Sequence, residues 1–385
     1  MEIYRVGGAV RDKLLKLPVT EQDWVVVGAS PQQMLELGYK QVGKDFPVFL
    51  HPETGEEYAL ARTERKTGPG YTGFSFHASP DVTLEQDLQR RDLTINAMAE
   101  AADGTLIDPC HGQDDLREGL LRHVSPAFVE DPVRILRVAR FAARFAHYGF
   151  KVAHDTNALM REMVANGEVD HLVPERVWAE LVKALGTDAP HRFFTVLRGC
   201  GALAVLFPEI DREFDDDRQA HNGQSLPAAL EALKNSVAHS DDPRVRFGVL
   251  ISSLGTGLDT NSRYNQAEDL CQRYRIPNDY TRLALAAIRL ECHARGSTPE
   301  NALQLMESGG AFKKTGFWQR LLSVYLITGI LDKPRADLLT ALATKAGAVS
   351  AAQLEDQSLR GPAIGEAIRA RRLRIIADAK LDPEH

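Results

Sequence analysis

The chain has 385 residues, of which 44% are hydrophobic and 26% are charged. This composition excludes a wholly disordered chain, and the length is sufficient for two or more domains. A net charge of −7 excludes a protein that coats nucleic acid indiscriminately, because lysine and arginine must neutralise phosphates for such binding. Any contact with RNA is therefore expected to be local.

The sequence shows no signal for a membrane or for secretion. No apolar run approaches the roughly 20 residues that span a bilayer, and the N-terminus MEIYRVGGAVRDK lacks the basic and apolar regions of a signal peptide. The four cysteines are far apart and form no CxxC pair, so neither a zinc site nor a disulfide framework is expected. We expect a cytoplasmic protein that does not contact a membrane.

The first part of the chain alternates short β-branched runs with turns. A helical segment, VRDKLLKL, follows the first run and ends at Pro18. Residues 61–76 predict a mobile loop, because Gly68, Pro69, Gly70 and Gly73 interrupt regular structure. The predicted strands are IYRVGG, DWVVVGA, FPVFLH, EEYALAR and TLIDP.

From about residue 126 onward the apolar residues follow helical spacing, most clearly in DPVRILRVARFAARFAHYGF and PERVWAELVKAL. The polar segment 209–227 is rich in turn formers and predicts a linker or a long loop. The pattern indicates an α+β fold with a small head (1–122), an all-α neck (123–208) and a helical body and tail (209–385).

The first candidate site combines a glycine turn with two acids. Gly7 and Gly8 precede a helix that carries Arg11, where backbone N–H groups could receive a triphosphate. Glu21 and Asp23 are two residues apart on the next predicted strand, so both carboxylates project from one face and could bind Mg²⁺. The alternative for this pair alone is two solvated acids at a strand edge. Glu57 is a candidate third ligand, which we interpret as a solvated glutamate.

Five blocks in order, over about 140 residues, resemble the tRNA nucleotidyltransferase and poly(A) polymerase family of the polymerase-β superfamily. They are GGxVRDxLL, the paired-acid strand, RRDLTINAMA, DPxxGxxDL and EDPVRILRVARFAARF. The sequence is most similar to the bacterial CCA-adding members, and this likeness extends to ERVWAEL and GALAVLFPEI. The resemblance implies a polymerase-β-like head, Mg²⁺ as cofactor, tRNA as partner, and CTP and ATP as substrates. It also implies that the loop after residue 61 helps the switch from C to A addition.

The RRD block can also be interpreted chemically. Arg91 could hold phosphate oxygens, and Asp92 could accept a hydrogen bond from a ribose hydroxyl. Taken without its neighbours, the triplet would indicate only a cluster of charges at a helix start.

The helix that starts near Pro132 carries the most specific pattern. Asp131 and Arg134 are three residues apart and are expected to be neighbours, and Arg137 and Arg140 continue the same stripe. A carboxylate acceptor beside a guanidinium donor matches the edges of cytosine and adenine, whereas uracil and guanine present the opposite pattern. The pair therefore predicts a protein template for C and A. The alternative is an ordinary Asp–Arg pair on a helix, worth about 0.3–0.5 kcal/mol.

The sequence departs from the family in two places. Glu21 stands where the usual pattern has aspartate, which keeps the ligand chemistry and changes its reach. Ser252 and Ser253 stand where some relatives carry the His-Asp pair of a metal-dependent HD phosphohydrolase. We expect no phosphohydrolase activity, and interpret the C-terminal helices as a surface that docks tRNA.

Two other functions remain open at this stage. A poly(A) polymerase shares the head and its chemistry, but usually carries a basic GRRF-type stretch where this chain has GKDFPVFLH. A non-catalytic RNA-binding relative would explain the unusual Glu21. The carboxylates at both metal positions, together with Arg91, Arg137 and Arg140, argue against that second alternative.

Overall fold

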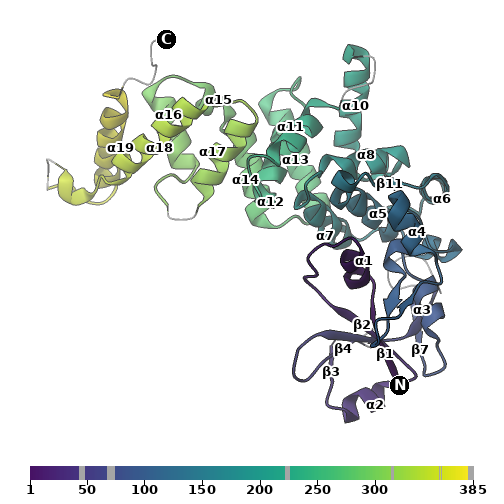
Figure 1. Ribbon diagram of the computed structural model, residues 1–385. Helices are drawn as coiled ribbons and strands as arrows, with labels where there is room; N and C mark the ends of the chain where they lie inside the picture. Colours follow the sequence, from purple (N-terminus) through teal and green to yellow (C-terminus); the bar gives the residue numbers. More distant parts are fainter. Residues whose placement is uncertain are drawn as a thin grey trace. The chain divides into compact units, whose positions relative to one another are not determined.

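The computed structural model divides the chain into two compact units, Met1–Leu206 (unit 1) and Phe207–His385 (unit 2). The sheets lie in unit 1, and unit 2 is helical in its described part (Figure 1). The α+β class expected from the sequence is confirmed. No helix within the described ranges is long and apolar enough to cross a membrane. The structure describes residues 1–42, 48–66, 74–221, 226–313, 316–354, 356 and 358–379.

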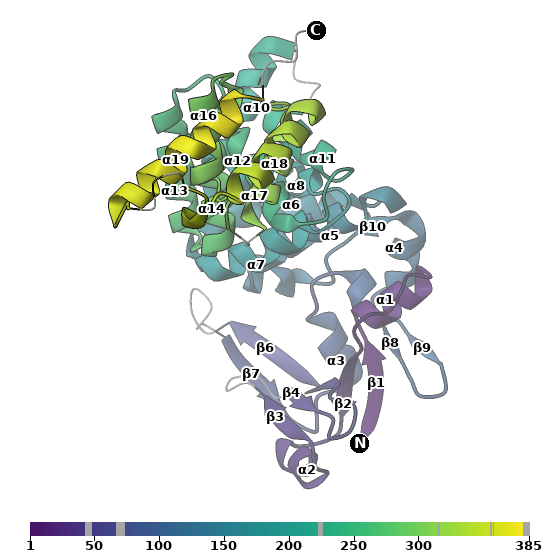
Figure 2. The ribbon, with the colours of Figure 1, turned by 90° about the vertical axis from the view of Figure 1, so that its left-hand side faces the viewer.

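Unit 1 begins with a seven-stranded mixed sheet of order β3-β4-β5-β2-β1-β8-β9 (Figure 2). β1 pairs antiparallel with β2 and β8, whereas β2 and β5 run parallel. The five predicted strand runs are confirmed, whereas β3 and β8 were not predicted. The strands are β1 (Glu2–Val6), β2 (Asp23–Val27), β3 (Lys40–Val42), β4 (Val48–Leu50), β5 (Glu57–Leu60), β8 (Ala99–Glu100) and β9 (Leu106–Ile107).

Both faces of this sheet are covered, as the alternation along β2 requires. Val25 packs with Val6 and Leu88, the last of which lies on α3 (Leu84–Gln89). Val26 packs on the other face with Met34 of α2 (Pro31–Glu36) and with Phe49. The sheet is therefore a rigid base for the side chains at its edge.

The prediction of a loop at residues 61–76 is wrong at both ends of this segment. β6 (Arg62–Lys66) and β7 (Phe74–Ala78) form an antiparallel pair, with Arg62 opposite Ala78 and Lys66 opposite Phe74. The breakers Gly68, Pro69, Gly70 and Gly73 are confined to the seven residues between the strands, so they do not interrupt pairing on either side. These four residues lie outside the described part of the chain.

The rest of unit 1 is mainly helical and packs around α5 (Val133–Arg144). α5 packs against α7 (Pro174–Leu185) and α8 (His191–Gly199), its apolar residues are buried, and its Arg140 pairs with Glu180 of α7. The helix predicted near Pro132 is thus confirmed. The other elements are α1 (Gly8–Leu14), η1 (Thr94–Asn96), α4 (Gly112–Glu118), β10 (Leu120–Leu121), η2 (Pro126–Glu130), η3 (Ala146–Tyr148), β11 (Lys151–Val152), α6 (His154–Ala165), η4 (Glu168–His171) and α9 (Ala202–Leu206).

Unit 2 has its own apolar core, in which α12 (Pro243–Ser252), α14 (Asn278–Arg289) and α17 (Phe317–Ile327) pack together. Val249, Leu283 and Val324 are fully buried there. The remaining elements are α10 (Pro208–His221), α11 (Ala228–Ser236), α13 (Thr260–Arg273), α15 (Glu291–Arg295), α16 (Pro299–Ser308), α18 (Lys333–Gly347), η5 (Ala351–Gln353) and α19 (Pro362–Ala377).

The linker expected at residues 209–227 is wrong for most of its length, because α10 covers residues 208–221. No glycine or proline lies between 209 and 221, and Glu209 and Asp211 in the first turn complement the helix dipole. Glu209 is also fixed by Arg273 of α13. Residues 222–225, which include a glycine, lie outside the described part.

Candidate active site

A cavity of about 880 Å³ opens in unit 1 between the sheet and the helices α5 and α7. Its volume suits a nucleotide-sized ligand. All ten residues expected to form the site line this cavity, so the structure brings them together. They are Gly8, Arg11, Glu21, Asp23, Arg91, Asp92, Asp131, Arg134, Arg137 and Arg140.

The glycine turn after β1 makes room for two arginines. Gly7 has a φ of 67° and a ψ of −126°, and a Cβ built on it would lie 2.8 Å from Nη1 of Arg91. Its N–H donates to the carbonyl of Met98, which fixes the turn. Arg11 is buried, bonded to Asn96 and Asp12, with its guanidinium over the rings of Phe141 and Phe145. Only a residue without a side chain fits at Gly7.

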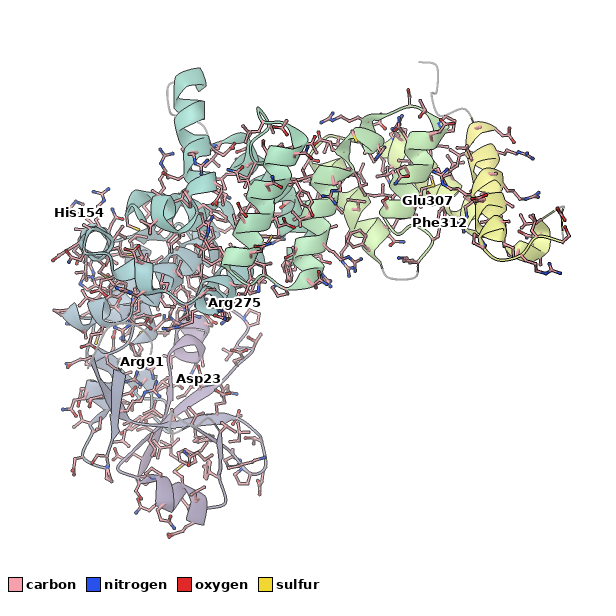
Figure 3. All side chains as sticks on the ribbon, turned by 180° about the vertical axis from the view of Figure 1, so that it is seen from behind. Asp23, Arg91, His154, Arg275, Glu307 and Phe312 are labelled. Atoms are coloured by element: carbon pink, nitrogen blue, oxygen red, sulfur yellow. The ribbon has the colours of Figure 1, made fainter. Side chains whose placement is uncertain are left out.

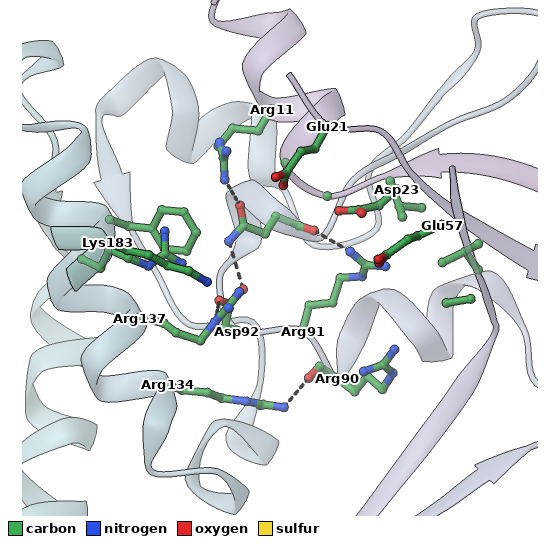
Figure 4. A pocket seen from close by; sticks show the side chains of 18 of the residues that line it. Arg11, Glu21, Asp23, Glu57, Arg90, Arg91, Asp92, Arg134, Arg137 and Lys183 are labelled. Carbon is green, nitrogen blue, oxygen red and sulfur yellow. Dashed lines mark hydrogen bonds and ion pairs between the residues drawn. The ribbon is translucent and has the colours of Figure 1, made fainter. Parts of the chain in front are cut away.

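Glu21 and Asp23 do not share a strand, which corrects the expected geometry. β2 begins at Asp23, and Glu21 lies two residues before it in irregular structure, because Pro18 and a polar segment delay the strand. Glu57 lies on the neighbouring parallel strand, in register with Asp23. All three carboxylates nevertheless line the cavity on one side (Figure 4).

The charges around Asp23 change its proton affinity. Desolvation raises the pKa of Asp23, the Arg91 guanidinium opposes this shift, and the Glu21 carboxylate adds to it, leaving the pKa above its ordinary value. Figure 3 shows Asp23 and Arg91 beside each other in unit 1. A cation bound near the three acids would stabilise their ionised forms.

The donor set fits a hard divalent cation that is completed by a substrate. No three His, Cys, Asp or Glu side chains among the described residues form a metal cage by themselves. Mg²⁺ is usually held by one or two carboxylates together with water and substrate phosphates. Glu21 and Asp23, with Glu57 beside them, supply oxygen ligands of that kind.

The RRD block is anchored through a buried acid, Asp87 of α3. Arg90 and Arg91 bond its two carboxylate oxygens at 2.7 and 3.1 Å, and the N–H of Arg62 also donates to it at 3.2 Å. Burial alone would raise the pKa of Asp87, but Arg91 and Arg90 outweigh it and hold the pKa below its ordinary value. Arg91 is therefore held at the cavity wall, close to Gly7.

Asp92 is buried and already bonded on both oxygens. It accepts from Nε of Arg137 at 2.6 Å, from the amide of Asn96 at 3.0 Å and from the N–H of Leu93 at 2.8 Å. Burial raises its pKa, but the charge of Arg137 and these hydrogen bonds dominate and hold the pKa well below the ordinary value. Asp92 thus ties the RRD block to α5.

The expected side-chain contact between Asp131 and Arg134 is wrong. Asp131 has an extended backbone and precedes the helix, so the three-residue helical spacing does not apply to it. Its carboxylate bonds Arg176 of α7 at 3.1 and 2.7 Å. Arg134 is buried and donates to the carbonyls of Ala127 at 3.0 Å and Arg90 at 2.7 Å.

The contribution of α7 was not predicted from the sequence. Arg176, Glu180 and Lys183 of α7 are spaced by four and three residues, and each of them lines the cavity or bonds a residue that does. Thr187, two residues beyond the end of α7, also lines the cavity. Glu180 pairs with Arg140, and Lys183 extends into the cavity (Figure 4). The spacing is visible in PERVWAELVKALGT but is also typical of any amphipathic helix.

Two protein-family models match segments of the chain that line this cavity. Residues 3–122 match the model described as "Poly A polymerase head domain", and residues 149–214 match "Probable RNA and SrmB- binding site of polymerase A". A head of this type, with acids at the sheet edge and an arginine-lined cavity, defines a nucleotidyltransferase.

Two curated relatives identify the kind of nucleotidyltransferase more closely. The chain is 52% identical to the multifunctional CCA protein of Thioalkalivibrio sulfidiphilus, with 99% of each chain covered. It is 50% identical to the multifunctional CCA protein of Nitrosococcus oceani, with 98% of each covered. The chain belongs to the family of bacterial CCA-adding tRNA nucleotidyltransferases.

Solved structures share the fold along the whole chain. The Bacillus stearothermophilus CCA-adding enzyme in complex with CTP aligns with a TM-score of 0.66 at 22% identity, covering 98% of this chain and 89% of that one. The Thermotoga maritima CCA-adding enzyme complexed with tRNA aligns with a TM-score of 0.61 at 23% identity, covering 98% and 90%.

Proposed function

We propose that this protein adds and repairs the 3′-terminal CCA of tRNA, using CTP and ATP and no nucleic-acid template. The observation that carries the proposal is that one cavity contains both Glu21 and Asp23, the acids proposed to bind the metal, and the arginines of α5. The names of the two curated relatives and the CTP and tRNA complexes of structural neighbours support it. Because tRNA is a cytoplasmic molecule in bacteria, we place the protein in the cytoplasm.

The reaction is an in-line displacement, in which the 3′ hydroxyl of tRNA attacks the α-phosphorus and pyrophosphate leaves. Nucleotidyltransferases of this family typically use divalent metal ions, and we propose Mg²⁺ here. When bound, the ion would favour the ionised hydroxyl and neutralise the triphosphate. Glu21 and Asp23 would hold it, while Gly8 and Arg91 would bind the phosphates, since both line the same wall.

Two further residues support the cavity wall through their hydrogen-bond partners. Arg11 and Asp92 are buried and face Asn96, so we assign them the task of fixing the wall behind the nucleotide. Asp92 also orients Arg137, whose side chain is over a third exposed and lines the cavity. The ribose contact expected for Asp92 stays a proposal, since Oδ2 accepts one bond from Arg137 and Asp92 lines the cavity.

Selection of C and A is assigned to Asp131 as acceptor and Arg134 as donor, with Arg137 and Arg140 shaping the rest of the base site. The two selecting groups come from adjoining segments and are held separately, Arg134 by backbone carbonyls and Asp131 by Arg176. Fixed donors and acceptors discriminate between bases better than mobile ones, because a mismatched base leaves a group unpaired.

The test is incubation of the purified protein with tRNA that ends before CCA and with each labelled nucleotide in turn. We expect two additions from CTP, then one from ATP, and none from UTP or GTP. Repeated addition of A to any RNA end would identify a poly(A) polymerase, the alternative that the head-domain match keeps open. Binding of tRNA without any addition would identify a non-catalytic relative.

A further inference from the structure

The polar stripe of α7 begins with Arg176, which lies at the cavity wall opposite the start of α5. Its guanidinium forms a bidentate pair with the carboxylate of Asp131, the geometry that arginine and carboxylates favour. Nη1 donates to Oδ1 at 3.1 Å and Nη2 donates to Oδ2 at 2.7 Å. The two side chains are 30% and 20% exposed, so the pair is shielded but reachable from the cavity.

The carboxylate of Asp131 needs such a partner because Asp131 lies before α5 and is not fixed by helical geometry. Its backbone is extended, with a φ of −119° and a ψ of 105°, and α5 begins only at Val133. The N–H of Val133 donates to Oδ1 at 3.1 Å. That single bond would leave the carboxylate free to rotate about it, and the contact with Arg176 removes this freedom.

The hydrogen bonds to Asp131 leave one defined acceptor position. A carboxylate offers about four lone-pair sites, two on each oxygen. Within the described part of the chain, Val133 and Arg176 occupy both sites of Oδ1, and Arg176 occupies one site of Oδ2. One site on Oδ2 remains, which matches one N–H of the exocyclic amino group of cytosine or adenine.

We propose that Arg176 is a positioning residue for nucleotide selection, which fixes the Asp131 carboxylate so that a single Oδ2 lone pair is presented to the base. The proposal rests on the template role assigned to Asp131 above and adds a residue from another helix to it. In this proposal Arg176 acts on nucleotide selection through Asp131, so its effect on selection should vanish when Asp131 is absent. A merely structural ion pair between α7 and the segment before α5 would lack this dependence.

The variants separate charge from geometry. Arg176→Lys keeps the positive charge but cannot bond both oxygens in one plane, and Arg176→Gln keeps a single uncharged donor. Arg122→Ala is the matched control, because Arg122 bonds Asp155 at 3.1 Å in unit 1 and does not line the cavity. Each variant is made in the full chain, and its folding is checked by circular dichroism and thermal unfolding.

The measurement is competition of all four nucleoside triphosphates for addition to tRNA that ends before CCA. We expect Arg176→Gln and Arg176→Lys each to lower the preference for C and A over U and G by about tenfold, the loss typical of one bidentate contact. Arg122→Ala should lower the melting temperature and leave this preference unchanged. Asp131→Ala/Arg176→Gln should be no less selective than Asp131→Ala alone, because the two act as one unit.

The outcomes distinguish this inference from the proposed function. Selectivity lost in Asp131→Ala but retained in both Arg176 variants would overturn the positioning role and leave the template intact. Selectivity retained in Asp131→Ala as well would overturn the template itself. Additive losses in the double variant, or equal loss of all four nucleotides in folded Arg176 variants, would also overturn the positioning role.

Discussion

Asp23 is the acid best placed to bind a catalytic metal, because it is the first residue of the central strand β2, beside Glu57 on β5 and two residues after Glu21. Replacing Asp23 by Ala should abolish incorporation of both C and A, since the metal loses its central ligand. Binding of tRNA should be nearly unchanged. Labelled CTP and ATP incorporation, with a gel-shift assay for tRNA, measures both effects.

Two comparison variants sharpen this prediction. Glu57→Gln should reduce the rate less than Asp23→Ala, and Glu21→Asp should preserve activity because the ligand type is unchanged. Incorporation by Asp23→Ala at more than a small fraction of the native rate in Mg²⁺ would show that the metal site is elsewhere.

Gly7 and Gly8 form a matched pair for testing the turn. Gly7→Ala places a Cβ at positive φ, 2.8 Å from Arg91, whereas a Cβ at Gly8 would meet only the tip of Arg11 at 3.3 Å. Strain of this kind costs about 1–3 kcal/mol. We expect Gly7→Ala to lower both stability and activity clearly, and Gly8→Ala to lower them less. Urea unfolding and CTP incorporation would contradict this if the two variants behaved alike.

At the scale of elements, the sequence predicts what depends on local pattern. The start of α5 is predicted from Pro132 and the apolar spacing, and the strands β1 and β2 from their β-branched runs. The loop expected after residue 61 is wrong at its flanks because pairing between β6 and β7 depends on two segments at once. Composition along one segment contains no signal for such a contact.

The same distinction between local pattern and distant contact applies to the candidate site. Sequence patterns identify all ten residues expected at the cavity, because their chemical types and order are visible. They do not identify the partners, since Arg176 is 45 positions from Asp131 and Arg137 is 45 positions from Asp92. Contacts between distant segments arise from packing, so Arg176 and Glu180 could be assigned only from the structure.

The link between the RRD block and α5 predicts a pH dependence. The pKa of Asp92 is lower in the folded chain than in an unfolded one, so its contribution to stability is present above about pH 4 and is lost as the pH falls further. Asp92→Asn should therefore cost about 1.5–3 kcal/mol near pH 6, the range for hydrogen bonds to a charged group. The difference from the native protein should shrink as the pH falls toward 2. Urea unfolding at several pH values measures it, and a constant difference would contradict the assignment.

At the scale of the whole molecule, the two curated relatives are named multifunctional, and the residues that align with an HD pair in the sequence, Ser252 and Ser253, lie in unit 2. Here α12 ends at Ser252, whose hydroxyl donates to the carbonyl of Val249 and whose own carbonyl accepts from Arg263. Two serines supply neither the imidazole nor the carboxylate that an HD-type metal site requires.

We therefore expect no metal-dependent phosphohydrolase activity from the full chain. Hydrolysis of bis(p-nitrophenyl) phosphate with Mn²⁺, Co²⁺ or Ni²⁺ should stay at the background of a buffer control, while the same preparation adds C and A to tRNA. Hydrolysis that survives in Asp23→Ala and rises with added Ni²⁺ would contradict this prediction.

Three arginines of α5 bond carboxylates from three different parts of unit 1. Arg137 bonds Asp92 of the RRD block, Arg140 bonds Glu180 of α7, and Arg144 bonds Asp12 of α1. Arg137 and Arg140 bond these carboxylates through Nε–H, so a nucleotide in the cavity can bond their Nη–H groups while each carboxylate keeps its arginine in place. Because the donors are fixed before the nucleotide arrives, little side-chain freedom is lost on binding, and we expect sharper discrimination between bases.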